Sequence, residues 1–152
     1  MDKTIVTAFL IIAGIVSAIF VFNAIYPAIQ QSSDAMTSME RRMDERLQSQ
    51  VQIVHATKSG SDVLVWAKNV GAKRVIGIEA CDVFFGPQTN YSRIPYGTGS
   101  PHWEYVVENN TEWLPTGTVR IIIKGYSPLA SGQYYVKVIL PNGVSDEYFF
   151  SW

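Results

Sequence analysis

The sequence predicts an α+β fold, with one long N-terminal helix over residues 1–50 and an antiparallel β-sandwich over residues 51–152. Three observations carry this prediction. An almost unbroken apolar run extends from Ile5 to Phe22, and apolar residues continue beyond it at helical spacing. In the second part of the chain, apolar and polar residues alternate in short segments that glycine- and proline-rich turns separate.

The apolar run is long enough to cross a bilayer. At a rise of about 1.5 Å per residue, roughly 20 apolar residues span the ~30 Å hydrocarbon core. A cleaved signal peptide would have a shorter apolar core, followed by a small-residue cleavage site. Lys3 and the start amine favour an N-terminus on the cytoplasmic side. Two interpretations remain open: a single-span membrane anchor, and a helix that sits first in the membrane and later packs with its copies in a filament core.

Beyond the apolar run, the helical pattern continues to about residue 50. Pro27 removes a backbone donor, so we expect a kink or a change of environment there. A helix of about 70 Å is too long for a domain of about 100 residues to cover, so part of it should contact neighbours. Its methionine-rich stripe suits adaptable contacts with other chains or with the chain's own sheet, and we expect both. The residues expected to form the assembly helix contacts are Ile5, Phe9, Ile12, Gly14, Val16, Phe20, Pro27, Met36, Met39 and Met43.

The second part of the chain reads as a series of short strands. The predicted strands lie at residues 51–56, 62–69, 75–79, 81–85, 103–108, 119–124, 134–140 and 146–152. A series of short strands at such regular spacing indicates an antiparallel sandwich. Asn142-Gly143 predicts a type I′ hairpin between the last two strands. The longest irregular stretch, residues 86–102, is expected to be either a contact-making loop or a solvated one.

Composition and motifs exclude several classes of function. The net charge is −1 and the few basic residues form no stripe, so we expect no nucleic-acid partner. Charged residues make up only 16% and aromatic residues 12%, which suggests that much of the surface meets protein, sugar or lipid. The sequence contains no nucleophile elbow, phosphate-binding loop or zinc-protease motif, and His55 and His102 lack metal-ligand spacing. We therefore expect no enzyme, cofactor or metal site, and a buried, inert Cys81.

Two tripeptides match the acceptor pattern for N-linked glycans. They are Asn90-Tyr91-Ser92 and Asn109-Asn110-Thr111, and both lie in polar, turn-rich surroundings. Asn90 and Asn109 are therefore candidate glycosylation sites on a domain outside the membrane. Trp103, Trp113 and Tyr105 could bind sugar if they were exposed, although packing within the sandwich is the more common use of such residues.

Three segments resemble the archaellin superfamily. They are Val51–His55, the stretch Val65-Trp66-Ala67-Lys68-Asn69-Val70-Gly71, and Val136–Glu147. With a pilin-like apolar helix before an Ig-like β-sandwich, the chain is similar both to archaellins and to the accessory stator proteins of the archaellum, the archaeal-type flagellum. For archaellins, the resemblance implies a helical polymer with central helices and outer, N-glycosylated sandwiches, assembled by an ATPase after prepilin peptidase cleavage. The sequence shows no charged leader with a Lys/Arg-Gly cleavage point before the apolar run, so we expect either that the numbering starts at the mature chain or that the anchor is uncleaved. Ile5 stands where many bacterial type IV pilins carry Glu.

Three hypotheses of function follow. The leading one is a structural subunit of an extracellular archaellum-type filament for cell motility, which polymerises with copies of itself after leaving the membrane. Such a subunit would also contact the motor or assembly platform and a surface layer. The alternative is a membrane-anchored stator or accessory protein whose sandwich binds the cell envelope or surface layer. The third, from outside this family, is a membrane-anchored adhesive domain that binds sugar through Trp103.

Overall fold

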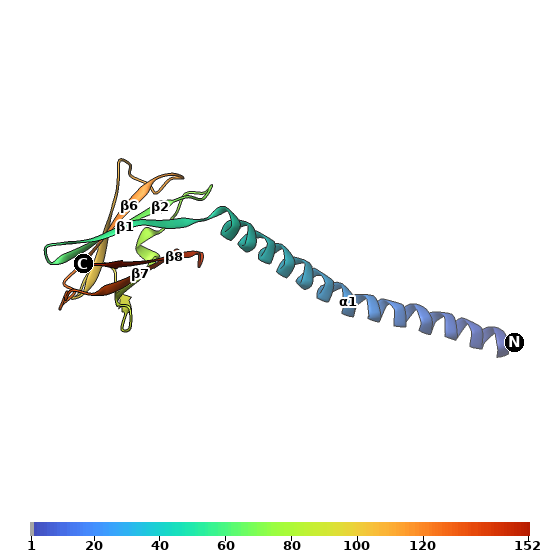
Figure 1. Cartoon of the computed structure of the whole chain (residues 1–152). Helices are drawn as coiled ribbons and strands as arrows, with labels where there is room; N and C mark the ends of the chain where they lie inside the picture. The colour runs from blue at the N-terminus through green and yellow to red at the C-terminus, as the bar shows by residue number, and fades with distance from the viewer. Residues whose placement is uncertain (1) are drawn as a thin grey trace. The chain divides into compact units, whose positions relative to one another are not determined.

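The computed structural model describes residues 2–152 and shows one long helix followed by two four-stranded antiparallel sheets (Figure 1). The predicted α+β class is therefore confirmed. The chain divides into two compact units between Arg42 and Met43. The last turn of the helix thus belongs to the same unit as the sheets.

Helix α1 (Asp2–Gln48) is continuous, and Pro27 lies inside it without ending it. An 18-residue window of this helix has a mean hydropathy of 2.8, which is apolar enough to cross a membrane. The hydroxyls of Thr7 and Ser17 each donate to the carbonyl four residues earlier, at 2.8 Å, so these polar groups are satisfied within the helix. No residue of α1 is buried.

Eight strands form the sandwich. They are β1 (Val51–Ser59), β2 (Asp62–Asn69), β3 (Asp82–Pro87), β4 (Ser92–Ile94), β5 (His102–Val107), β6 (Thr118–Lys124), β7 (Gln133–Ile139) and β8 (Ser145–Ser151). One sheet has the strand order β1-β2-β6-β5 and the other has the order β4-β3-β7-β8. Alternate residues of the central strands face the space between the sheets, as the period-2 pattern predicts. The core includes Val63, Val65, Ile121, Ile123, Val83, Phe85, Val136 and Val138, each at most 1% exposed.

Two strands differ from the sequence prediction. The segment 75–79 is not a strand, because Val75 makes a single bridge to Trp113 and a 3-10 turn, η1 (Ile78–Ala80), follows it. Gly77 enters that turn with a φ of 70°, which ends the extended conformation. Strand β4 lies within the stretch predicted as irregular. Its three residues are too few to show an alternating pattern.

The β7–β8 hairpin does not use the expected type I′ turn. Gly143 donates its N–H to Leu140 O at 2.8 Å, which closes a turn with Pro141 and Asn142 at its centre. A type I′ turn needs a positive φ at both central residues, whereas the ring of Pro141 fixes a negative φ at the first. The positive φ falls on Gly143 instead, at 85°. The proline therefore overrides the Asn-Gly signal and gives a three-residue loop.

A side chain joins the edges of the two sheets at β1 and β8. Strand β1 has an irregularity between Ile53 and His55, which leaves Val54 without a partner in β2. The Ile53 N–H donates to Asp146 Oδ2 on β8 at 2.7 Å. This bond satisfies an edge amide that would otherwise be available for pairing with another chain.

Candidate functional site

The loop after β2 is bonded to the last turn of α1 and to the residues that lead into β1. Ala72 N–H donates to Gln48 O at 2.8 Å, and the Val70 and Gly71 N–H groups donate to Gln50 O at 2.9 and 3.1 Å. The last carbonyls of a helix have no partner within the helix, so the loop supplies one. We call this arrangement, residues 48–50 with residues 69–73, the junction.

Asn69 organises the junction from inside. It is a buried polar residue at 0% exposure. Its Nδ2 donates to Lys73 O at 2.8 Å and lies 3.4 Å from Trp113 O, and its Oδ1 accepts the Gly71 N–H at 3.0 Å. A buried amide is tolerated when its donors and acceptors are satisfied, as they are here. The side chain thereby holds the loop in one conformation.

Gly71 lets the loop approach the main chain before β1. A Cβ atom at this position would lie 2.5 Å from Gln50 N and 2.6 Å from Gln48 O. Both neighbours are backbone atoms and cannot move aside as a side chain end can, so the close approach requires glycine. Asn69 and Gly71 both belong to the segment that carried the family resemblance. Their role was not predicted, although an Asn two residues before a Gly is compatible with an Asx turn, in which the Asn side chain bonds to the backbone two residues on.

Charged groups add weak contacts around the junction. Lys73 Nζ lies 3.7 Å from Asp44 Oδ2, with both side chains about half exposed. Arg46 Nε donates to Asn142 O at 3.1 Å. Exposed pairs of this kind contribute about 0–1 kcal/mol each. The backbone bonds and Asn69 are therefore the main source of order at the junction.

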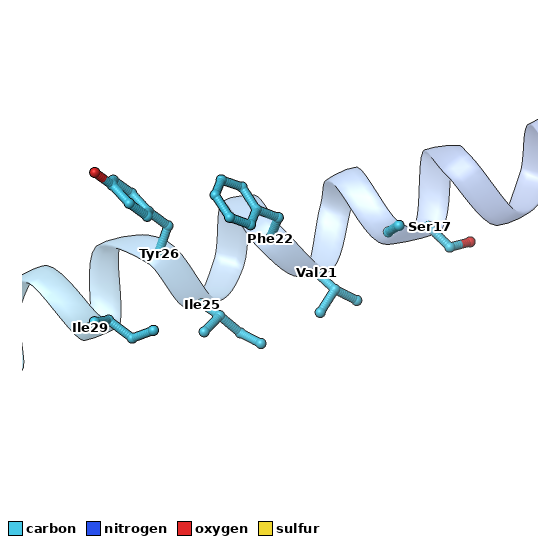
Figure 2. A pocket seen from close by; sticks show the side chains of 7 residues that line it. Ser17, Val21, Phe22, Ile25, Tyr26 and Ile29 are labelled. Atoms are coloured by element: carbon cyan, nitrogen blue, oxygen red, sulfur yellow. The ribbon is translucent and has the colours of Figure 1, made fainter.

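The predicted assembly residues all lie on α1, and none of them is buried. Figure 2 shows one of its faces, where an open hollow of about 470 Å³ runs along the helix. The rings of Phe22 and Tyr26 stack there at 5.5 Å. Of the methionine-rich stripe, Met43 and Leu47 belong to the sandwich unit and are 63% and 83% exposed. The expected side-chain seam against the chain's own sheet is absent at these two residues, and the contacts of the last turn that the structure shows include backbone hydrogen bonds from Ala72 and Lys73 to Gln48 O.

The remaining candidates are divided between surface and core. Asn90 is exposed in the turn between β3 and β4, and Asn109 is exposed in the turn between β5 and β6 with a φ of 58°. Trp103 and Trp113 are 1% exposed, so the hypothesis of sugar binding through Trp103 is wrong: both indoles fill the core. Within residues 2–152, no group of three or more His, Cys, Asp or Glu side chains could hold a metal ion.

Cys81 is buried at 3% exposure, as predicted. Burial raises the pKa of its thiol to about 12, and the charges of Asp82 and Glu79 act in the same direction. The thiolate is the reactive form of cysteine, so this side chain is chemically inert at neutral pH.

Comparison with known proteins adds evidence that the geometry cannot provide. No protein-family model matches the chain. An uncharacterised protein from Archaeoglobus fulgidus is 25% identical over 162 residues, which cover 99% of this chain and 98% of the relative. The archaellum periplasmic stator protein FlaG from Sulfolobus acidocaldarius is 32% identical with a TM-score of 0.61, over 67% of this chain and 99% of FlaG. A chain in the complex of FlaF and FlaG from the same organism is 35% identical with a TM-score of 0.59, over 66% of this chain and 88% of that one.

These matches overturn the leading hypothesis from the sequence. Both solved relatives are periplasmic stator proteins, so the expectation of an extracellular filament subunit that polymerises with its copies is wrong. The physical reason is that lipid and a filament core are both apolar. A helix that is apolar on all sides fits either environment, and its sequence does not distinguish between them.

Proposed function

Because this chain belongs to the archaellum-related family of the periplasmic stator protein FlaG, we propose that it is a membrane-anchored stator component of an archaellum. The observation that carries the proposal is the 32% identity to FlaG across 99% of the FlaG chain. The proposed role is structural rather than catalytic. A stator has to stay fixed while the filament turns, so it needs one attachment in the membrane and another outside it.

The apolar part of α1 supplies the membrane attachment in this proposal. Its hydropathy and length suit a single span, and its side chains are exposed and free to contact lipid. Its backbone polar groups are paired within the helix, which is the condition for crossing hydrocarbon. The hollow beside Phe22 and Tyr26 would be filled by acyl chains.

The part of α1 after Pro27 acts as a spacer. Residues 27–42 extend the helix by about 24 Å beyond the proposed span, at about 1.5 Å per residue. This part carries charged residues such as Asp34 and Arg41 beside its exposed methionines, and therefore suits water better than lipid.

The junction transmits load in the second unit. A stator is pulled between its two attachments, and any pull that reaches the sandwich through the chain enters it at residues 48–51. The backbone bonds to Gln48 and Gln50 and the buried Asn69 make this entry resistant to local opening. For the second attachment, the solved complex of FlaF and FlaG supports a FlaF-like protein as the partner of the sandwich. The cell envelope or its surface layer is the structure against which this pair would be held.

The test is complementation of a deletion strain with anchor variants. Deleting the gene should abolish swimming, and the full chain should restore it. The double variant Ile11→Lys with Ile15→Lys places two charges in the span at a cost of about 5–7 kcal/mol, and should neither enter the membrane fraction nor restore swimming. The matched control Met36→Lys with Met39→Lys alters two exposed positions in the spacer and should restore it. Swimming that survives deletion would contradict the proposal.

A further inference from the structure

Three aromatic rings form a ladder on the face of the β4-β3-β7-β8 sheet that points away from the core. Tyr91 and Tyr135 have ring centroids 4.5 Å apart, and Tyr135 and Phe149 are 5.1 Å apart. Tyr91 is 49% exposed and Phe149 is 53% exposed, and both flank the buried Tyr135. Strands β7 and β8, which carry the last two rings, are labelled in Figure 1. Two large exposed rings on either side of a buried one form an apolar patch that can serve as a contact surface.

Gly86 allows the chain that carries Tyr91 to pack beside Tyr135. Gly86 pairs with Tyr135 in the register of β3 and β7. A Cβ atom on Gly86 would lie 2.6 Å from Asn90 O and 2.7 Å from Tyr91 Cα, so only glycine lets the returning chain pass this closely. Tyr91 packs on Tyr135 beside this gap, and the Tyr135 hydroxyl donates to Glu147 Oε2 at 2.9 Å. The rings are therefore held in place without any partner.

A glycan acceptor lies directly beside the ladder. Asn90 precedes Tyr91 and begins the tripeptide Asn90-Tyr91-Ser92. Its N–H donates to Pro87 O at 2.8 Å, which fixes the turn, while the residue itself is exposed. Asn90 is thus an exposed residue in a fixed turn, and the next residue carries the half-exposed ring of Tyr91.

We propose that Asn90 carries an N-linked glycan whose first sugars lie on the two exposed rings of the ladder, Tyr91 and Phe149. This rests on the proposed function, because the modification requires a sandwich outside the membrane. In the modification, Asn90 Nδ2 forms a bond to C1 of a sugar on a lipid-linked phosphate donor. The bond from C1 to the phosphate oxygen breaks, the lipid phosphate leaves with the bonding electrons, and one amide proton is lost.

Chemistry and proximity both favour this occupant of the ladder. The C–H faces of sugar rings are apolar and pack on the faces of aromatic rings, while their hydroxyls remain in water. A glycan tethered to Asn90 is also present at a high effective concentration over rings that begin at the next residue. The second acceptor, Asn109, has charged neighbours instead: Glu108 pairs with Arg120 at 3.2 Å. It therefore serves as a matched control.

The experiment uses full-length protein from the membranes of its own host. Mass spectrometry should find added sugar mass on the peptide that contains Asn90, and both Asn90→Gln and Ser92→Ala should remove it. Loss of the glycan should lower the Tm of the sandwich by about 4 °C when Phe149 is present. In a Phe149→Ala background, the same loss should lower the Tm by less than half as much. Thr111→Ala, which disables the second acceptor, should give the same Tm change in both backgrounds.

The outcomes separate this inference from the proposed function. In the first outcome, protease added outside the cell cuts the sandwich, but Asn90 carries no glycan. This result would overturn the inference and leave the stator proposal standing. A sandwich protected from that protease would overturn both. Equal Tm losses with and without the Phe149 ring would show a glycan that does not lie on the ladder, which also overturns the inference.

Discussion

Gly71 donates its backbone N–H to Asn69 Oδ1 at 3.0 Å, and this bond shapes the loop that meets the last turn of α1. The same Asn69 side chain donates to Lys73 O, so one buried amide bonds to both sides of the loop. The loop then offers its own N–H groups to Gln48 and Gln50. The loop of the junction thus depends on Asn69 and Gly71, which are separated by one residue in the sequence.

Asn69→Ala should lower the free energy of unfolding of the sandwich by about 2 kcal/mol, because it removes the hydrogen bonds that this buried amide makes to Lys73 O and to Gly71 N–H. Urea unfolding of the full chain in detergent, followed by tryptophan fluorescence, measures this. Asn142→Ala is the control. Its Oδ1 accepts one bond, from Val144 N–H at 3.2 Å, at the half-buried β7–β8 turn, so it should cost about 1 kcal/mol or less. Equal effects of the two variants would show that burial of Asn69 is unimportant.

Gly71→Ala should destabilise the sandwich by about 2 kcal/mol, because the added Cβ overlaps backbone atoms of residues 48–50. Gly132→Ala is the matched control, since a Cβ there meets no atom within 4 Å. The same unfolding measurement applies, together with hydrogen exchange at the amides of residues 70–73. Exchange that stays as slow as in the unmodified chain would contradict the close approach.

Asp146→Ala should cost about 2 kcal/mol, since the Ile53 N–H loses a charged acceptor at 2.7 Å between the two sheet edges. The freed edge of β1 should also promote association of chains. Asp146→Asn retains an acceptor oxygen and should lose less than Asp146→Ala. Unfolding curves and light scattering measure the two effects, and a fully stable Asp146→Ala that does not associate would show that the bond is dispensable.

Stability should fall as pH rises above about 9. The folded-state pKa of the Cys81 thiol is raised from its ordinary 9.0 to about 12, mainly by burial. Between these values the unfolded chain loses the thiol proton while the folded chain keeps it, so rising pH favours unfolding. The slope from this one group is at most about 1.4 kcal/mol per pH unit. Cys81→Ala should flatten the decline in unfolding free energy between pH 9 and 11, and an unchanged slope would assign the decline to other groups.

The secondary-structure elements could be predicted well where the spacing of apolar residues repeats several times. The helix was predicted to end near residue 50 and ends at Gln48, and the apolar alternation placed the core strands, such as β2 and β6, because burial of one face enforces the period. Strand β4 was missed because three residues carry no period. The turn at Asn142-Gly143 was misjudged because the preceding proline sets φ.

The functional features were harder to predict because they depend on long-range contacts. Nothing near Asn69 in the sequence shows that it meets Trp113 O, 44 residues away, or that Gly71 meets Gln48. Tyr91 and Phe149 are likewise joined only through Tyr135. The choice between filament and stator could not be made from the helix, because an apolar surface fits lipid and protein equally.

The most direct test of the stator proposal is where the chain is found in intact cells. Filaments sheared from the cells and the membranes left behind should be analysed by quantitative mass spectrometry, after mild cross-linking. We expect the chain in the membrane fraction, cross-linked through its sandwich to a FlaF-like protein, and absent from the sheared filaments. Recovery in the filaments, in amounts comparable with the main filament subunit, would contradict the stator proposal.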